Sequence, residues 1–254
     1  MAYNIDLSGK SVLVTGASRG IGKSVAEHLA RAGARVAVHF RRNREPAEEL
    51  ARSIGNDSFA IGADLALRDA CLSLFDECAG RMGRVDVLVS NAGLAICAPF
   101  DIEESTWIDA WDKQMDVNLR ASGILAFKAI KHFKEYGGGR IVFVSSRAAF
   151  RGDTADYMAY GASKSGLLGL NGSIARGFGK DNITSFVIAP GFTRTDMAQE
   201  FIDEYGEEYA LSDIALNRLT EPGDVAPMVV LLSSGLADHA TGTSIDVNAG
   251  SYVH

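Results

Sequence analysis

The sequence predicts an α/β fold in which a doubly wound, largely parallel sheet of about seven strands is covered by helices on both faces. Short β-branched and apolar runs alternate along the chain with longer segments of helical periodicity, which is typical of parallel strands joined by crossover helices. The first strand ends in a glycine-rich turn that opens directly into a helix. No linker-like stretch interrupts this pattern, so we expect a single domain over residues 1–254.

The strands are read from short apolar runs that stop at Gly, Asn, Ser or Pro, and several helices end at a glycine such as Gly33 or Gly83. A closed eight-stranded barrel is the competing architecture, but about seven strands are found. The predicted strands cover 11–15, 35–40, 58–61, 85–89, 140–144, 184–188 and 244–247. The predicted helices cover 21–32, 45–54, 67–81, 103–136 in two pieces, 155–179, an acidic segment at 193–219, and 225–232.

Charge, hydropathy and residue spacing argue against several classes of function. The net charge of -7, from 25 basic and 32 acidic residues, argues against a nucleic-acid-binding surface. There is no apolar run long enough to span a bilayer and no leader at 1–10, so we expect no membrane partner and a cytoplasmic location. Cysteines and histidines lack metal-ligand spacing, which predicts no metal site. Surface or capping positions are expected for the histidines, which are His28, His39, His132, His239 and His254.

The glycine-rich turn at 16–22 reads Gly-Ala-Ser-Arg-Gly-Ile-Gly. Such a turn points backbone N–H groups and the positive end of a helix dipole at one spot, which suits a phosphate. Three chemistries fit it: a dinucleotide pyrophosphate site, the nucleophile elbow of a serine hydrolase centred on Ser18, or an NTPase phosphate loop ending at 22–24. Only one strand precedes Ser18, and Ala17 replaces a glycine of the NTPase loop, which disfavours the last two. The turn alone does not decide.

Four residues outside this turn suggest proton-transfer chemistry. Tyr160 and Lys164 are four positions apart in a predicted helix and therefore share one helical face. A phenol titrates near 10 unaided, and a neighbouring ammonium is expected to lower that pKa towards neutrality. Ser146 follows the preceding strand, where its hydroxyl could bind a substrate carbonyl. Asn118 is a polar residue in an apolar helical pattern.

On these residues the chain resembles the classical short-chain dehydrogenases/reductases over nearly its whole length. The resemblance implies a Rossmann-type dinucleotide-binding domain and an enzyme that interconverts a ketone and a secondary alcohol by hydride transfer. Tyr157 has no lysine four residues later, and it is expected to line the substrate pocket instead. The resemblance is carried by the turn at 15–22, Asn91-Ala92-Gly93, Asn118, Ser146, Tyr160 with Lys164, Pro190-Gly191 and Asn248-Ala249-Gly250.

The same resemblance implies a role for each polar residue. Tyr160 would exchange a proton with the substrate oxygen, Ser146 would polarise that oxygen, and Lys164 would hold the nicotinamide ribose as well as acidify the phenol. Asn118 is implied to hold a water in a proton relay that reaches Lys164. The implied cofactor contacts are Gly16, Ser18, Arg19, Gly20, Ile21, Gly22, Asp64, Leu65, Asn91, Ala92, Gly93, Tyr160, Lys164, Pro190, Gly191 and Thr193.

Charge at the end of the second strand predicts NADP(H) as the cofactor. An NAD site usually has a carboxylate there for the adenosine ribose, but this chain has Phe40 followed by Arg41 and Arg42. Arg19 projects from the glycine-rich turn, and guanidinium groups around a missing acid suit a 2'-phosphate. Arg41 and Arg42 are therefore added to the cofactor contacts. The alternative is that they are solvated surface arginines.

The resemblance is strongest to 3-oxoacyl-carrier-protein reductases and related small-carbonyl reductases, so a small-molecule carbonyl or alcohol substrate is expected. A sugar or polyol dehydrogenase, and a catalytically silent NADP-binding regulator on the same fold, stay open as alternatives. The acidic segment at 193–219 is expected to close over the substrate as a lid, and its carboxylates oppose docking of an acidic carrier. A homotetramer is implied by the resemblance alone.

Overall fold

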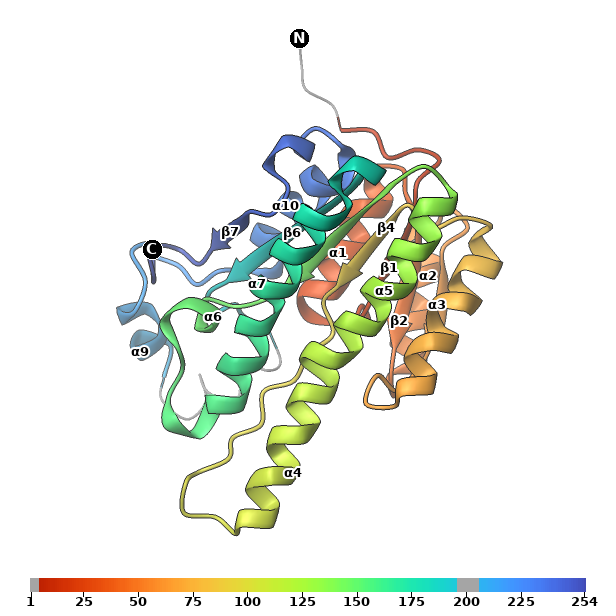
Figure 1. The fold of residues 1–254 in the computed structure, drawn as a ribbon. Coiled ribbons are helices and arrows are strands. Elements are labelled where there is room, and N and C mark those ends of the chain that lie inside the picture. The colour runs from red at the N-terminus through yellow and green to blue at the C-terminus, as the bar shows by residue number, and fades with distance from the viewer. Residues whose placement is uncertain (1–4, 196–205) are drawn as a thin grey trace.

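The computed structural model describes residues 5–195 and 206–254, and in this part of the chain seven strands form one sheet (Figure 1). The strands pair in parallel in the order β3-β2-β1-β4-β5-β6-β7. Helices cover both faces of this sheet, which confirms the predicted doubly wound α/β fold. The strands are β1 (Ser11–Val14), β2 (Arg35–Phe40), β3 (Phe59–Gly62), β4 (Val87–Ser90), β5 (Gly139–Val144), β6 (Ile183–Pro190) and β7 (Ser244–Val247).

Strands β2 and β7 have the bounds that the sequence predicts, and the others differ at their ends. Strand β6 is longer than predicted because its pairing with β7 continues to Pro190, which lies opposite Val247. Proline has no N–H to donate, and a strand end is where this loss is tolerated. Strand ends therefore depend on the neighbouring strand as well as on local sequence.

Two predicted helices are divided in the structure. The helical region at 103–136 is two helices joined by η1, a π-helical turn, and the region at 155–179 begins and ends in a short 3-10 turn. The helices are α1 (Gly20–Arg31), α2 (Arg44–Ile54), α3 (Arg68–Met82), α4 (Glu104–Gln114), α5 (Ala121–Glu135), α6 (Ala148–Arg151), α7 (Met158–Phe178), α9 (Glu207–Ser212) and α10 (Pro222–Ser234). The short turns are η1 (Met115–Arg120), η2 (Ala155–Tyr157), η3 (Gly179–Asp181) and η4 (Asp238–Ala240).

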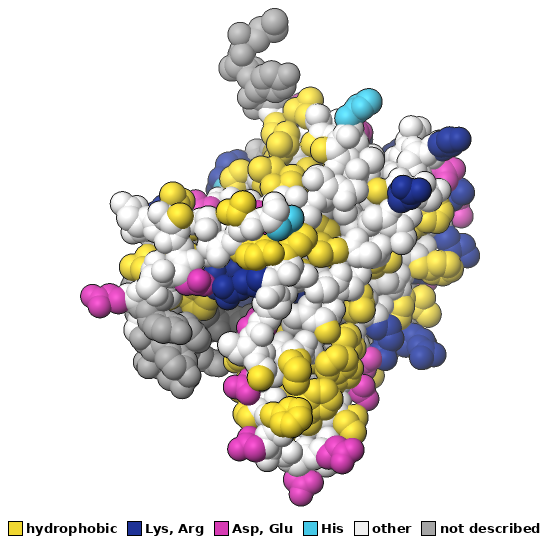
Figure 2. Space-filling model, turned by 60° about the vertical axis from the view of Figure 1, so that its left-hand side comes forward, with side chains coloured by type: hydrophobic (Ala, Val, Ile, Leu, Met, Phe, Trp, Pro, Cys, Tyr) yellow, Lys and Arg dark blue, Asp and Glu magenta, His cyan; other side chains and the backbone are white. Residues whose placement is uncertain are grey.

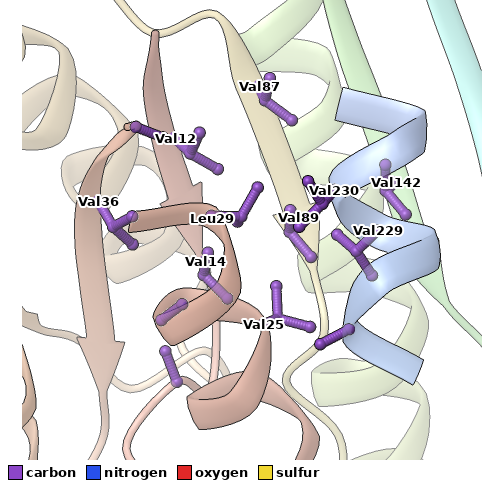
Figure 3. Packing of buried hydrophobic residues seen from close by; sticks show 14 of the residues in the cluster. Val12, Val14, Val25, Leu29, Val36, Val87, Val89, Val142, Val229 and Val230 are labelled. Atoms are coloured by element: carbon purple, nitrogen blue, oxygen red, sulfur yellow. The ribbon is translucent and has the colours of Figure 1, made fainter. Parts of the chain in front are cut away.

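The core consists of two apolar layers, one on each face of the sheet. Alternate residues of a strand point to opposite faces, so Val12 and Val14 enter one layer while Leu13 enters the other. Figure 3 shows the first layer, in which valines of β1, β2 and β4 pack against Val25 and Leu29 of α1 and against α10. Burial on both faces holds the carboxyl ends of the strands in fixed positions.

The acidic segment is described only in part. Helix α9 lies within it, whereas residues 196–205 lie outside the described residues, so the predicted lid at 193–219 stays a prediction.

Among the described residues, no helix combines the length and the apolar character that a membrane span needs. Within those ranges, no group of three or more His, Cys, Asp or Glu side chains is placed to hold a metal ion.

Candidate active site

A cleft of about 500 Å³ opens where the sheet reverses its strand order, between the carboxyl ends of β1 and β4. Most of the predicted cofactor residues line this cleft, although they come from distant parts of the chain. They are Gly16, Ser18, Arg19, Gly20, Ile21, Gly22, Arg41, Arg42, Asp64, Leu65, Asn91, Ala92, Gly93, Tyr160 and Lys164. The structure adds His39, Phe40, Asn43, Leu94, Val117, Val144, Ser145 and Thr195 to the lining.

Thr15 and Asn91 join the ends of β1 and β4. The Thr15 hydroxyl accepts hydrogen bonds from the main-chain N–H groups of Asn91 and Ala92, both at 2.9 Å. The Asn91 amide donates to the carbonyl oxygens of Thr15 at 2.9 Å and Gly16 at 3.1 Å. The turn after β1 is therefore held directly against the Asn-Ala-Gly segment after β4.

Two glycines are closely packed in the cleft, Gly22 too closely for any side chain. A Cβ on Gly22 would lie 2.3 Å from the Gly16 carbonyl oxygen and 2.5 Å from the Asn91 amide nitrogen, closer than real Cβ contacts. A Cβ on Gly93 would lie 3.1 Å from Lys164 Nζ. Glycine here lets the backbone pass beside polar side chains, so the cleft has the cradle that a dinucleotide phosphate and ribose would fit.

Tyr160 and Lys164 lie on α7 and face the same cleft. Lys164 is buried, and its Nζ donates to the Val144 carbonyl oxygen at 2.9 Å and lies 5.8 Å from the centre of the Tyr160 ring. The Tyr160 hydroxyl shares a hydrogen bond with Ser146 at the end of β5. Tyrosine, lysine and serine are thus brought to one place by the α7 face and the β5 end.

The pKa of Tyr160 differs from the sequence-based expectation. Burial raises the pKa of this phenol above its usual value of 10, and the hydrogen bond from Ser146 and the charge of Arg147 only partly oppose that change. Burial also lowers the pKa of Lys164 to about 8, so the lysine stays mostly charged at pH 7. The expected lowering of the Tyr160 pKa is therefore not found in this structure, because burial is the largest influence on this phenol.

Asn118 lies in the π-helical turn η1, and its side chain is fully buried. The Oδ1 atom accepts from Leu94 N–H at 2.9 Å, and Nδ2 donates to the Leu94 carbonyl and to Ser163 Oγ, also at 2.9 Å. Ser163 Oγ in turn donates to the Tyr160 carbonyl at 2.8 Å. Both amide hydrogens of Asn118 are thereby used inside the protein, so its side chain joins the segment after β4 to α7. The predicted water relay stays a prediction.

The two serines after β5 have different positions. Ser145 is buried and its hydroxyl donates to the Lys164 carbonyl oxygen at 2.9 Å, so it joins the end of β5 to α7. Ser146 is only partly buried and accepts from Ala148 N–H at 3.1 Å. Ser146 is the serine that bonds to the Tyr160 hydroxyl, whereas Ser145 lines the described cleft. The predicted role of Ser146 at the substrate oxygen stays a prediction.

The other end of the cleft carries positive charge. Arg19, Arg41 and Arg42 are exposed and line it, and Phe40 occupies the end of β2. Asp64 also lines the cleft, where its Oδ1 accepts from Ala66 N–H at 3.0 Å in the turn before α3. Three guanidinium groups and one carboxylate thus surround this end of the cleft.

Three predicted cofactor residues do not line the described cleft. Pro190 ends β6, Gly191 packs against Asn248, and Thr193 is buried with its hydroxyl donating to the Gly191 carbonyl at 3.1 Å. Thr195, two residues later, lines the cleft instead. A cofactor role for the first three stays a prediction.

His39 is the site residue that the sequence reasoning missed. The prediction of a surface or capping position is wrong, because the ring is 2 % exposed and lines the cleft beside the glycine-rich turn. The available signal was a histidine at the end of an otherwise apolar strand, next to a predicted ligand site. Its contacts lie too far along the chain to be read from local sequence.

Comparison with known proteins identifies the family. Residues 10–206 match the protein family described as short chain dehydrogenase. The chain belongs to the short-chain dehydrogenase family. It is 37% identical over 250 residues to the 3-oxoacyl-[acyl-carrier-protein] reductase FabG of Staphylococcus aureus, an alignment that covers 96% of this chain and 98% of that protein.

Solved structures of short-chain dehydrogenases are similar over the whole fold. A short chain dehydrogenase from Burkholderia cenocepacia in complex with NADP has a TM-score of 0.88 and 32% identity, covering 96% of this chain and 98% of that one. A 3-ketoacyl-(acyl-carrier-protein) reductase from Brucella melitensis complexed with NADH has a TM-score of 0.88 and 27% identity, covering 98% of this chain and 100% of that one. This short-chain dehydrogenase is therefore an oxidoreductase that acts on CH–OH or C=O groups with an NAD(P) cofactor.

Proposed function

We propose that the protein is an NADP(H)-dependent reductase of a small ketone or a 3-oxoacyl thioester. The observation that supports this proposal is that Tyr160 and Lys164 line the cleft that the glycine-rich turn forms, with Ser146 hydrogen-bonded to Tyr160. A bound nicotinamide supplies the hydride to the substrate carbon. The chain itself supplies the proton and the polar contacts at the substrate oxygen.

The protonation state of Tyr160 suits a proton donor. Because the pKa of Tyr160 is raised, its phenol stays protonated at neutral pH and has a proton to donate to the carbonyl oxygen. Ser146 is hydrogen-bonded to that phenol and would donate to the same substrate oxygen. Lys164 lies beside the Tyr160 ring and Gly93, where it would bind ribose hydroxyls.

The test is the phenol itself. In Tyr160→Phe we expect kcat for NADPH oxidation with an activated ketone to fall by at least about 100-fold, the usual contribution of a positioned acid. Tyr136→Phe is the matched control, because this tyrosine is exposed at the end of α5 and does not line the cleft. Similar kcat values for Tyr160→Phe and wild type would contradict the proposal, and turnover in neither protein would favour the NADP-binding regulator.

The preference for NADP(H) rests on Arg19, Arg41 and Arg42 at one end of the cleft. In Arg41→Asp we expect the KM for NADPH to rise about tenfold or more while the KM for NADH changes little, because only NADPH carries the 2'-phosphate. Arg52→Asp makes the same charge change on the exposed face of α2, away from the cleft, and serves as the control. Equal effects of Arg41→Asp on both nucleotides would contradict the preference.

The substrate class is proposed from the similarity to 3-oxoacyl-[acyl-carrier-protein] reductases. A screen of ketones, 3-oxoacyl thioesters and sugar alcohols with both nicotinamides separates this class from the sugar or polyol dehydrogenase. Highest kcat/KM on a polyol would favour that alternative.

We also propose a homotetramer, for which the apolar surface of α4 gives support. Figure 2 shows hydrophobic side chains gathered on the protruding end of the molecule that α4 forms. Ile108 on α4 is 44% exposed, and Phe127 on α5 is 57% exposed. Light scattering after size exclusion tests whether the protein is a tetramer.

A single domain, the lid at 193–219 and the cytoplasmic location are further parts of the proposed function.

A further inference from the structure

His39 lies at the carboxyl end of β2 and is buried against the glycine-rich turn. Its Nδ1 accepts a hydrogen bond from Gly16 N–H at 3.0 Å, and its Nε2 lies 3.1 Å from the Ala63 carbonyl oxygen. A backbone N–H only donates and a carbonyl only accepts, so the neutral ring with its proton on Nε2 is the one form that satisfies both partners. Burial lowers the pKa of His39 to about 4, which agrees with a neutral ring at physiological pH.

The main chain of His39 holds the same turn. Its carbonyl oxygen accepts from Ala17 N–H at 2.8 Å, so one residue binds two consecutive N–H groups of the turn. On the other side, a Cβ on Gly16 would lie 2.9 Å from Ala92 Cα, and Gly16 has a φ of 62° that favours glycine. The first peptides of the turn are thus fixed between His39 and the segment after β4.

The end of this turn is the start of α1 at Gly20, on the cleft wall. The first N–H groups of a helix have no partner inside the helix, and they bind phosphate well when their direction is fixed. If the Gly16 peptide is held in one orientation, the N–H groups at the start of α1 are held in one orientation as well. The buried hydrogen bond between His39 and Gly16 can therefore affect phosphate binding in the cleft.

We propose that His39 is a positioning residue for the dinucleotide: its Nδ1 orients the Gly16 peptide and thereby aligns the start of α1 with the pyrophosphate. This inference rests on the proposed dinucleotide site. The competing interpretation is that His39 is a buried polar residue that only stabilises the fold. The two interpretations differ in which half of the imidazole matters for binding.

Two substitutions separate the halves of the ring. Asparagine places its Oδ1 near the position of Nδ1, so His39→Asn keeps an acceptor for Gly16 and loses the donor to Ala63. Glutamine extends its amide towards the position of Nε2, so His39→Gln keeps a donor for Ala63 and loses the acceptor for Gly16. Each variant leaves one buried backbone group without its partner, so a role in stability alone predicts similar losses for both.

The experiment is calorimetric titration of the full-length variants with NADPH and with NADH, together with their thermal unfolding. We expect His39→Asn to bind within about threefold of wild type and His39→Gln to bind at least about tenfold more weakly, with the same ratio for both nucleotides because they share the pyrophosphate. His239→Asn, at an exposed histidine away from the cleft, is the control and should bind as wild type does.

Equal affinities of the two variants, or weaker binding by His39→Asn than by His39→Gln, would overturn the inference while leaving the proposed function standing. Failure of the wild type to bind either nucleotide would overturn the proposed function first. If neither variant folds, long-range ¹H–¹⁵N spectra of the wild-type imidazole provide the test. An unprotonated Nδ1 with a protonated Nε2 supports the inference, and a proton on Nδ1 overturns it.

Discussion

Burying the charged side chain of Lys164 in the candidate active site lowers the stability of the folded protein. Its side chain is buried, and burial lowers its pKa from 10.5 to about 8. At about 1.4 kcal/mol for each pH unit, this difference corresponds to roughly 3 kcal/mol of unfavourable free energy in the charged, folded form. Replacing Lys164 with methionine, which has similar length and no charge, removes that cost.

The substitution also removes a hydrogen bond. Lys164 Nζ donates to the Val144 carbonyl oxygen, and leaving a buried carbonyl without a partner costs about 1 to 3 kcal/mol. The two effects oppose each other, so at pH 7 we expect Lys164→Met to lie between no change and a gain of about 2 kcal/mol in the free energy of unfolding. We expect turnover to be lost in the same variant, because Lys164 lies beside Tyr160.

The stability difference between Lys164→Met and wild type should change with pH. Below pH 8 the lysine is charged in both the folded and the unfolded chain, and the folded protein carries the full cost. As the pH rises from 8 towards 10.5, the folded chain loses the proton first and the wild type gains stability. The advantage of Lys164→Met over wild type should therefore shrink by up to roughly 3 kcal/mol across this range.

Urea unfolding of wild type and Lys164→Met at pH 7 and pH 9.5 measures both quantities. Lys180→Met, at an exposed lysine in η3, is the control and should not change the free energy of unfolding by more than about 0.5 kcal/mol. A destabilisation of Lys164→Met by more than about 1 kcal/mol at pH 7, or a difference from wild type that is the same at both pH values, would refute the reasoning.

The remaining predictions concern Gly93 and His39. Because a Cβ on Gly93 would lie 3.1 Å from Lys164 Nζ and 3.3 Å from Asn118 Oδ1, Gly93→Ala should lower kcat/KM about tenfold, whereas Gly80→Ala on α3, which meets nothing within 4 Å, should leave it unchanged in the same steady-state assay. The folded pKa of His39 is about 4, against 6.5 when unfolded, so the free energy of unfolding should fall by up to roughly 3 kcal/mol as the pH drops through this range, although Asp64 nearby favours the charged ring. Denaturant titrations at pH 7 and pH 4.5 would show this slope in the wild type, and His39→Asn should lack that part of it.

Local pattern predicts much of the fold and part of the candidate site. Strands β2 and β7 have their predicted bounds because β-branched residues alternate along them, Val36 and Val38 in β2 and Ile245 and Val247 in β7. Tyr160 and Lys164 share a face because four residues are about one helical turn. The glycine-rich turn meets the Asn-Ala-Gly segment because parallel strands end at one edge of the sheet.

The features that the sequence did not predict depend on contacts between distant residues. His39 bonds to Gly16 and Ala63, which lie 23 and 24 positions away, so nothing beside it in the sequence reveals its burial. Whether the pKa of Tyr160 is raised or lowered depends on how deeply the phenol is buried. The four-residue spacing to Lys164 in the sequence carries no information on that burial. The π-helical turn at Asn118 likewise forms where the side chain bonds to Leu94 and Ser163.

The seam between β1 and β4 has a consequence for how the protein matures. Strands β1 to β3 lie on one side of this seam and β4 to β7 on the other, and Thr15 and Asn91 fasten the two sides together. A nucleotide at the proposed site would have its full set of contacts only when both sides have met, so it would stabilise the finished sheet more than a half-folded chain. Under the proposed function, bound cofactor would therefore raise the free energy of unfolding more than it would speed folding.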